Sequence, residues 1–206
     1  GFDEKLYKNP AVGDTYEPGS TFKLFATAAA LDLSLIAPTT RCPICTGPRT
    51  IGGFEISTWN KKYYPNSSVV EILQHSDNVG VTFIADKLGI DNLYSYIKKF
   101  GFGDPTGIDL QEEVAGSIRP KDQWRPIDLA TASFGQGLAV TGVQMVQAVS
   151  VFANGGKLIT PKITGVISSE NKDQKVEPDQ VRQIISPKTA AQITEIMVNT
   201  VKEGEA

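Results

Sequence analysis

Histidine and cysteine, the usual ligands of structural zinc, are scarce in this chain of 206 residues. It has one histidine, His75, and two cysteines, Cys42 and Cys45. A structural zinc ion normally takes four ligands, so these three residues leave one position unfilled. We therefore expect neither a metal site nor a cofactor.

An excess of basic charge and a long apolar run are also missing. The formal net charge is −3, so we expect no nucleic-acid partner. No apolar run reaches the roughly 18 residues that span a bilayer, and no signal peptide opens the sequence. Because the chain begins at Gly1 rather than at a methionine, we expect an excised piece of a longer protein whose membrane anchor lies outside it.

The two cysteines form a single Cys-Pro-Ile-Cys unit at Cys42 and Cys45. A redox dithiol of the thioredoxin kind would lie in a βαβ context, whereas the surroundings here are rich in Pro, Thr and Gly and predict a loop. We favour a disulfide that staples this loop, or paired thiols without a catalytic role. Metal binding and redox chemistry stay open as alternatives.

The hydrophobic and capping patterns predict one helix-rich α+β domain over residues 1–206, with a small hairpin inserted near 47–64. Capping boxes at Ser68 and Thr141 and a Ser186-Pro187 start mark three helix beginnings. The expected helices are 69–74, 79–88, 93–100, 128–133, 142–153 and 187–201. The expected strands are 49–51, 54–59, 162–168 and 181–185.

A hydroxyl and an amine stand three residues apart at Ser20 and Lys23. Residues i and i+3 are neighbours on a helix surface, so Lys23 could accept a proton from Ser20 as the hydroxyl attacks. Pro18 and Gly19 predict a turn just before Ser20, and the apolar run from Phe22 to Leu31 predicts a buried helix in which Lys23 is the only charge before Asp32. The alternative is structural, with Lys23 extending to solvent and Ser20 capping the helix.

The same Ser-x-x-Lys spacing occurs at Ser95/Lys98 and at Ser169/Lys172, without the Pro-Gly turn. A second group of polar residues lies between two predicted helices, at Ser76 and Asn78. A short break of this kind can direct a hydroxyl and an amide into a cleft, where Ser76 relays a proton and Asn78 holds a substrate amide and helps to fix Lys23. The alternative is a capped helix junction with Asn78 exposed.

Several segments along the chain share features with one known family of proteins. They are Tyr16-Glu17-Pro18-Gly19-Ser20-Thr21-Phe22-Lys23, Ser76-Asp77-Asn78-Val79-Gly80, Phe100-Gly101-Phe102-Gly103, Thr106-Gly107-Ile108-Asp109-Leu110, Ser133-Phe134-Gly135-Gln136-Gly137, Gln144-Met145 and Phe152-Ala153-Asn154-Gly155-Gly156. Together these segments resemble the transpeptidase domain of class B penicillin-binding proteins. The resemblance runs in order along the chain from Gly13 to the last predicted helix. The Asn78-Val79-Gly80 continuation is more similar to division-type and sporulation-type members than to elongation-type ones.

The resemblance implies acyl transfer on peptidoglycan stem peptides and acylation by β-lactam antibiotics. Ser20 would attack the D-Ala-D-Ala carbonyl, Lys23 would act as base, and the Ser20 backbone N–H would donate to the oxyanion. Ser76 and Asn78 would complete the catalytic set. It also implies a place on the extracytoplasmic face of the bacterial cytoplasmic membrane, among cell-wall synthesis or division proteins.

One family motif is missing from the sequence, the Lys-Thr-Gly or Lys-Ser-Gly strand, since Lys188-Thr189-Ala190 lacks the glycine. We therefore expect the penicillin-binding and serine β-lactamase-like fold without most of its central antiparallel sheet, and little or no turnover by this piece. A non-catalytic β-lactam sensor or a division scaffold is the main alternative. A serine β-lactamase is a weaker one, because its deacylating base would have to be Glu195, far from Ser76 in sequence.

Overall fold

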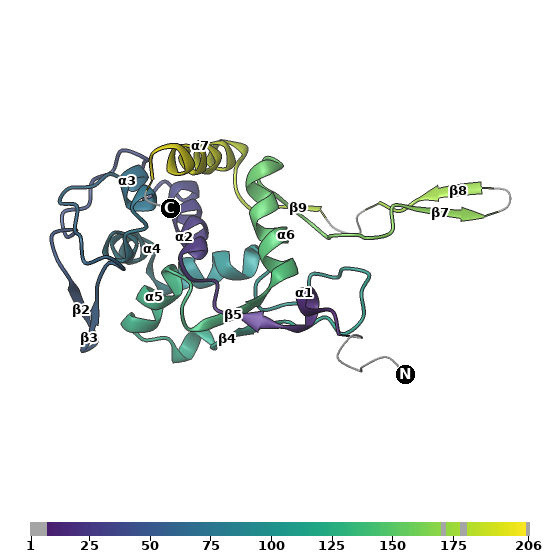
Figure 1. Cartoon of the computed structure of the whole chain (residues 1–206), viewed down its shortest axis with the longest axis horizontal. Helices are drawn as coiled ribbons and strands as arrows, with labels where there is room; N and C mark the ends of the chain where they lie inside the picture. Colours follow the sequence, from purple (N-terminus) through teal and green to yellow (C-terminus); the bar gives the residue numbers. More distant parts are fainter. Residues whose placement is uncertain (1–7, 170–171, 178–180, 205–206) are drawn as a thin grey trace.

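The computed structural model describes residues 8–169, 172–177 and 181–204, and helices dominate these ranges (Figure 1). The helices are α1 (Pro10–Gly13), α2 (Lys23–Asp32), α3 (Val69–Gln74), α4 (Asn78–Lys99), α5 (Pro126–Ser133), α6 (Gly142–Ala153) and α7 (Pro187–Glu203), with 3₁₀ turns η2 (Gly19–Phe22) and η3 (Lys121–Gln123). The strands are β1 (Thr15–Tyr16), β2 (Arg49–Ile51), β3 (Phe54–Ile56), β4 (Ser117–Ile118), β5 (Leu138–Thr141), β6 (Lys157–Ile159), β7 (Val166–Ser169), β8 (Lys172–Lys175) and β9 (Val181–Gln183). The predicted helix-dominated α+β class is confirmed. No helix in the described ranges is both long and apolar enough to cross a membrane.

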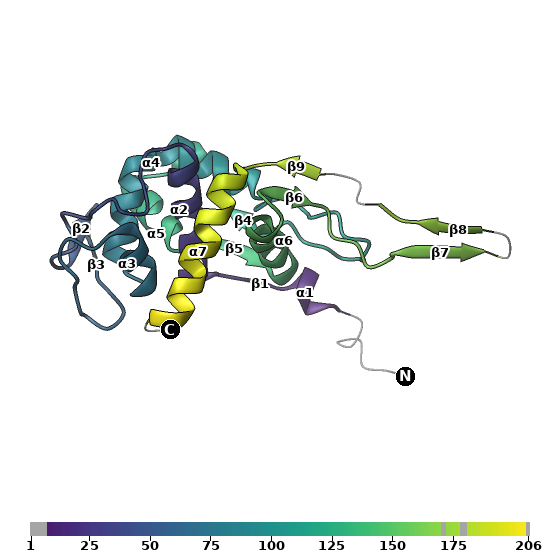
Figure 2. The ribbon, with the colours of Figure 1, turned by 90° about the horizontal axis from the view of Figure 1, so that it is seen from above.

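Helix α2 is the centre of the core, as its apolar sequence predicts. It packs against α4, α5 and α7 (Figures 1 and 2). Phe25 on α2 is 1% exposed, and its ring lies 5.0–5.6 Å from the rings of four other phenylalanines. Each such aromatic pair stabilises the fold by about 0.5–1.5 kcal/mol beyond the free energy gained from the area that it buries. The helix that carries Lys23 is therefore held on several sides.

Local capping signals set the helix boundaries where the sequence predicts them. The Ser68 and Thr141 side chains accept hydrogen bonds from the third backbone N–H groups of α3 and α6. Ser186 caps α7, which has Pro187 at its first position. The two helices predicted over 79–88 and 93–100 form one element, α4, which is broken at Gly89 by a left-handed φ of +71°.

The strands are short, and the largest sheet in the described ranges has three of them, in the order β1-β5-β4. Strands β2 and β3 form the hairpin expected from the sequence, although β3 ends at Ile56 rather than near residue 59. The strands expected over 162–168 and 181–185 are shorter than predicted and belong to different pairs. The first, β7, pairs with β8, and the second, β9, pairs with β6.

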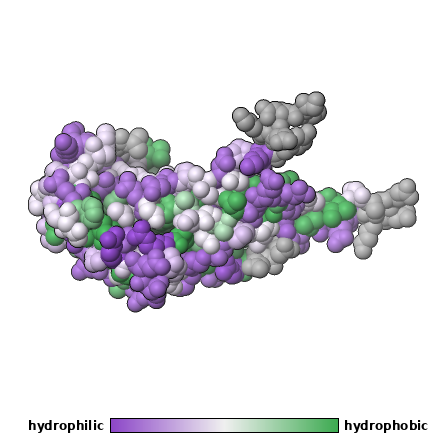
Figure 3. All heavy atoms as spheres, turned by 90° about the horizontal axis from the view of Figure 1, so that it is seen from below, coloured by the Kyte–Doolittle hydropathy of each residue, from purple (hydrophilic) through white to green (hydrophobic). Residues whose placement is uncertain are grey.

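The β7–β8 pair extends away from the body as an arm (Figures 1 and 2). Its apolar side chains Val166 and Ile167 are 52% and 56% exposed, and Ile163, just before β7, is 62% exposed. Hydrophobic residues are visible along this arm in Figure 3, next to the grey atoms. Within the described residues β7 pairs only with β8, so the arm makes no contribution to the core.

Cys42 and Cys45 are joined in a disulfide and are fully buried in the main core. Cys42 N–H donates to Ser67 O, and Arg41 forms a β-bridge with Ser68, the cap of α3. The predicted disulfide is therefore present within this loop, and the backbone contacts beside it tie the loop to the start of α3. In the described part of the chain no group of three His, Cys, Asp or Glu side chains could hold a metal ion.

Candidate active site

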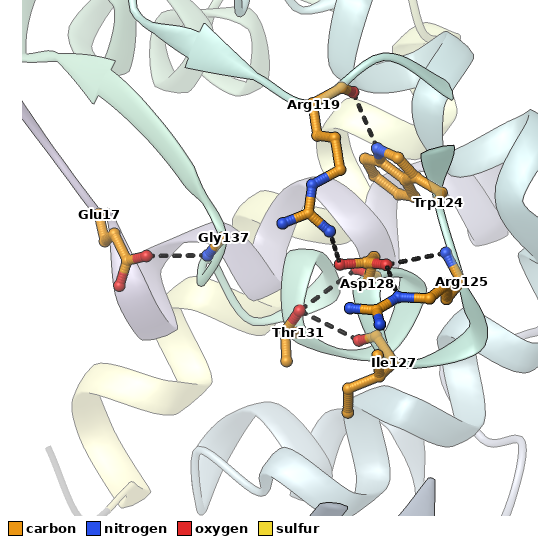
Figure 4. Close-up of polar contacts among 8 residues, drawn as sticks. All are labelled: Glu17, Arg119, Trp124, Arg125, Ile127, Asp128, Thr131 and Gly137. Carbon is orange, nitrogen blue, oxygen red and sulfur yellow. Dashed lines mark hydrogen bonds and ion pairs between the residues drawn. The ribbon is translucent and has the colours of Figure 1, made fainter. Parts of the chain in front are cut away.

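The segment before α2 holds Ser20 at the surface on a clamped turn. Gly19 has a φ of +59°, and its N–H donates to Gly135 O at 3.0 Å. A Cβ on Gly135 would lie 2.3 Å from Gly19 O, so only glycine allows this approach. A second contact joins the residues two positions away in each segment, where Gly137 N–H donates to Glu17 Oε1 at 2.9 Å (Figure 4). The segment just before Ser20 is therefore held by the loop after α5.

Lys23 lies in the core, one turn after Ser20, with only 2% of the residue exposed. Its Nζ donates to the backbone oxygen of Ser76 at 2.6 Å and to Ser76 Oγ at 2.9 Å. The alternative structural interpretation does not hold, because Lys23 does not extend to solvent. Ser20 is also not a cap, since Pro18 and Phe22 occupy the cap positions of η2 and α2 without a side-chain hydrogen bond.

Burial controls the protonation of Lys23. Removing the ammonium from water lowers the pKa of Lys23 to about 8, and the nearby Asp77 opposes part of this effect. Burial also raises the pKa of Asp77, which is 1% exposed. Near pH 8 about half of the Lys23 side chains are therefore neutral amines that can accept a proton.

Ser76 ends α3 and receives Lys23 in a backbone conformation that is uncommon for serine. Its φ is +50°. Ser76 N–H donates to Leu73 O at 3.1 Å and Asp77 N–H donates to Ile72 O at 2.9 Å, which is the hydrogen-bond pattern of a Schellman helix end. A left-handed conformation costs a residue with a Cβ about 1–2 kcal/mol. The turn places both oxygen atoms of Ser76 within reach of Lys23 Nζ.

Asp77 and Asn78 start the next helix directly after this turn. Asp77 Oδ1 accepts from Val79 N–H at 2.8 Å and caps α4. Asn78 is half-buried, and its Nδ2 donates to Ser57 O at 3.0 Å, while its Oδ1 makes no hydrogen bond with the described residues. Within the described residues no hydrogen bond joins Asn78 to Lys23, whose Nζ donates to the two oxygen atoms of Ser76 instead.

The structure thus brings Lys23 and Ser76 into direct contact and places Ser20 one turn before Lys23. Within the described residues both hydrogen bonds of Lys23 Nζ go to Ser76, and no hydrogen bond joins Ser20 to Lys23. Sequence analysis missed the roles of Gly135 and Ser57. The paired glycines at 135 and 137 were the available signal for the first, and no sequence signal indicates the second.

The arrangement has the parts for acyl transfer. It combines an exposed hydroxyl on a rigid turn, a buried amine that is partly neutral near pH 8, and a second hydroxyl bonded to that amine. Asn78 Oδ1 adds a hydrogen-bond acceptor. A nucleophile, a base and a proton relay are the groups that this chemistry needs.

The chain is similar to known proteins in sequence and in structure. The family model described as penicillin binding protein transpeptidase domain matches residues 2–206. Stage V sporulation protein D of Bacillus subtilis (strain 168) is 38% identical over 206 residues, which is 98% of this chain and 32% of that protein. The probable peptidoglycan D,D-transpeptidase PenA of Neisseria meningitidis serogroup A is 32% identical over 202 residues, which is 98% of this chain and 32% of that protein.

Among solved structures, penicillin binding protein 3 from Mycobacterium tuberculosis, complexed with aztreonam, is similar with a TM-score of 0.86 and 28% identity. The match covers 94% of this chain and 43% of that chain. This chain therefore spans about a third of the length of the curated relatives that it matches.

Proposed function

This chain belongs to the penicillin-binding protein transpeptidase family, and from that premise we propose that it is the Ser20-bearing part of a peptidoglycan D,D-transpeptidase. The predicted resemblance to sporulation-type members agrees with the name of the Bacillus subtilis relative. The single observation that carries the proposal is the hydrogen bond from the buried Lys23 amine to Ser76 Oγ, and burial lowers the pKa of this amine to about 8.

In the proposed acylation, Ser20 Oγ attacks the carbonyl carbon of the D-Ala-D-Ala bond while the neutral Lys23 amine takes the hydroxyl proton. The Ser20 N–H donates to the oxyanion that forms. As the C–N bond breaks, Ser76 Oγ passes a proton to the leaving D-alanine amine and recovers one from Lys23. An amine of a neighbouring stem peptide then attacks the acyl-enzyme by the reverse proton path and forms the cross-link.

A β-lactam would acylate the same serine and leave slowly. Since the sequence has no Lys-Thr-Gly motif, the second oxyanion donor and the carboxylate-binding strand of the family are not supplied by these residues, and turnover by this piece should be weak or absent. The parent protein would act on the extracytoplasmic face of the bacterial cytoplasmic membrane, anchored outside residues 1–206 and working with other cell-wall synthesis or division proteins.

Intact-mass spectrometry after incubation with a penicillin tests the proposal. The native chain should gain the mass of one drug molecule, and Ser20→Ala should gain none. Ser95→Ala is the matched control, because Ser95 belongs to the same Ser-x-x-Lys spacing on α4 and lies at the surface. An adduct on Ser20→Ala, or none on the native chain, would contradict the proposal.

The missing third motif favours one alternative, a β-lactam sensor or division scaffold without transpeptidation. A sensor would form the same adduct and release it slowly, but would not join two stem peptides when the parent protein is assayed. A serine β-lactamase would hydrolyse the drug quickly. It has less support, because Glu195 is exposed on α7.

A further inference from the structure

A cleft of about 440 Å³ begins at Asn78 and runs between the β2–β3 hairpin and α5. Its volume is within the range of small-ligand sites. Asn78 contributes an amide whose nitrogen is bonded to Ser57 O and whose oxygen is without a hydrogen-bond partner in the described ranges. A substrate amide bound to that oxygen would continue into the cleft. Phe54, Ile56, Asn78, Arg125 and Phe134 are among the side chains that line the cleft.

The floor of this cleft is apolar. Ile56 and Phe134 are 6% and 7% exposed and belong to a small hydrophobic cluster separate from the main core. Phe54 lies at the edge with 58% of its surface exposed. Such a floor suits an aliphatic arm better than a polar one. Glu55 also borders the cleft, but strand alternation turns its side chain to the face of β3 opposite Phe54 and Ile56.

An ion pair stands at the wall of the cleft, because Arg125 and Asp128 both line it. Asp128 binds two arginines, Arg119 and Arg125, so the group carries a net charge of +1 (Figure 4). Arg125 reaches Asp128 through Nε at 3.3 Å, and within the described residues its Nη1 and Nη2 make no hydrogen bond. Arg125 lines the cleft and is 66% exposed in its side chain, whereas Arg119 does not line it. The paired Nη groups of an arginine match a carboxylate in geometry and charge.

We propose that this cleft is a subsite for a substrate side chain that is aliphatic along its length and ends in a carboxylate, with Arg125 as the residue that selects the carboxylate. The inference rests on the proposed transpeptidase function, because it uses Asn78 to hold the substrate amide. It adds a preference that the catalytic residues do not provide. The ligand chemistry is a peptide, or a β-lactam that imitates one, with an acidic arm.

The test uses two β-lactams that share a ring system and differ only at the end of the side chain, one carboxylate and one carboxamide. The native chain should be acylated about five- to twentyfold faster by the carboxylate compound, and the ratio should fall as salt is added. Arg125→Gln should bring the ratio near one, mainly by slowing acylation by the carboxylate compound. Arg119→Gln, which alters the same Asp128 group outside the cleft, should keep most of the preference.

A ratio that is unchanged in Arg125→Gln, or that falls equally in Arg119→Gln, would overturn the subsite. Circular dichroism would confirm that both variants are folded.

A second measurement separates this proposal from the acylation chemistry. In Ser20→Ala, NMR titration with N-acyl-D-Ala-D-Ala peptides should shift the Arg125 Nε–H signal with a carboxylate arm and much less with a carboxamide arm. If penicillin leaves no adduct on the native chain, the proposed function fails and this titration still decides the subsite. Equal shifts with both peptides would overturn the subsite alone.

Discussion

Two helices of this protein carry the same Ser-x-x-Lys spacing in opposite surroundings. On α2, Lys23 is 2% exposed and donates to both oxygen atoms of Ser76. On α4, the Lys98 side chain is 36% exposed and its Nζ pairs with Asp104 at 2.6 Å and with Gly103 O at 3.2 Å. Lys23 is therefore removed from solvent and donates to neutral oxygen atoms. Lys98 is partly exposed to solvent and forms an ion pair with Asp104.

The comparison shows that spacing alone does not make a base. The pKa of a lysine falls when burial outweighs nearby negative charge, which is the case for Lys23. The third occurrence of the spacing is not on a helix, because Ser169 and Lys172 are register partners across the β7–β8 pair. The Pro18-Gly19 turn and the buried helix after it therefore separated a candidate base from two chance matches.

Replacing each lysine with methionine should give the largest difference between the two regions, measured as the rate of acylation by penicillin. Lys23→Met should slow acylation by penicillin about 10²- to 10⁴-fold, while Lys98→Met should leave the rate within about twofold. Stability should not follow the acylation rate, because the buried Lys23 ammonium is unfavourable for folding. Since the folded-state pKa of Lys23 lies below the unfolded value of 10.5, the unfolded chain binds more protons near pH 8–10, and the ammonium destabilises the fold at neutral pH.

Lys23→Met should therefore keep or raise the melting temperature at pH 7, measured by calorimetry. A large fall in melting temperature would show that the two hydrogen bonds to Ser76 outweigh the cost of the buried charge. Normal acylation by Lys23→Met would remove Lys23 from the role of base.

The clamp on the Ser20 turn offers a second contrast, which acts through the backbone. Gly135→Ala would place a Cβ 2.3 Å from Gly19 O and 2.8 Å from Phe22 Cβ at a φ of +76°. We expect a loss of about 2–4 kcal/mol in unfolding free energy and slower acylation, because the turn must move. Gly155→Ala is the matched control, with a φ of +73° and no atom within 4 Å. It should cost about 1 kcal/mol and leave acylation unchanged, as measured by urea unfolding and by the acylation rate.

The smallest expected effect is on the pH profile. Acylation should rise with pH through a midpoint near 8, because only neutral Lys23 accepts the proton. The Asp77 carboxylate favours the ammonium, so Asp77→Asn should move the midpoint to lower pH and speed acylation a few-fold below it. Asp104→Asn, at the Lys98 pair, should leave the profile in place. A midpoint that moves to higher pH in Asp77→Asn would contradict the electrostatic role of Asp77.

Much of the fold was predictable because its signals are local. A capping box needs residues three apart, as at Ser68 and Glu71, and a glycine that breaks a helix acts alone, as Gly89 does in α4. The contact between Lys23 and Ser76 was predictable for a different reason. Lys23 is the only charge before Asp32 in a buried apolar helix and therefore needs a polar partner, and Ser76 lies in a short polar break between two buried helices.

The three-stranded sheet was not predictable, because its strands are two to four residues long and too short to show alternation. Its pairings also join distant segments, such as Thr15 with Thr141. The bond from Asn78 to Ser57 and the close approach of Gly135 to Gly19 depend on how separate elements pack. No residue pattern within either segment reports such a contact.

The left-handed turn at Ser76 has a consequence for how this protein could be improved in the laboratory. At that position the backbone favours glycine, while the proposed chemistry needs a hydroxyl. A library ranked by thermal survival would enrich Ser76→Gly, and a library ranked by drug labelling would discard it. Selection for stability would therefore favour glycine at position 76, and selection for reactivity would favour serine.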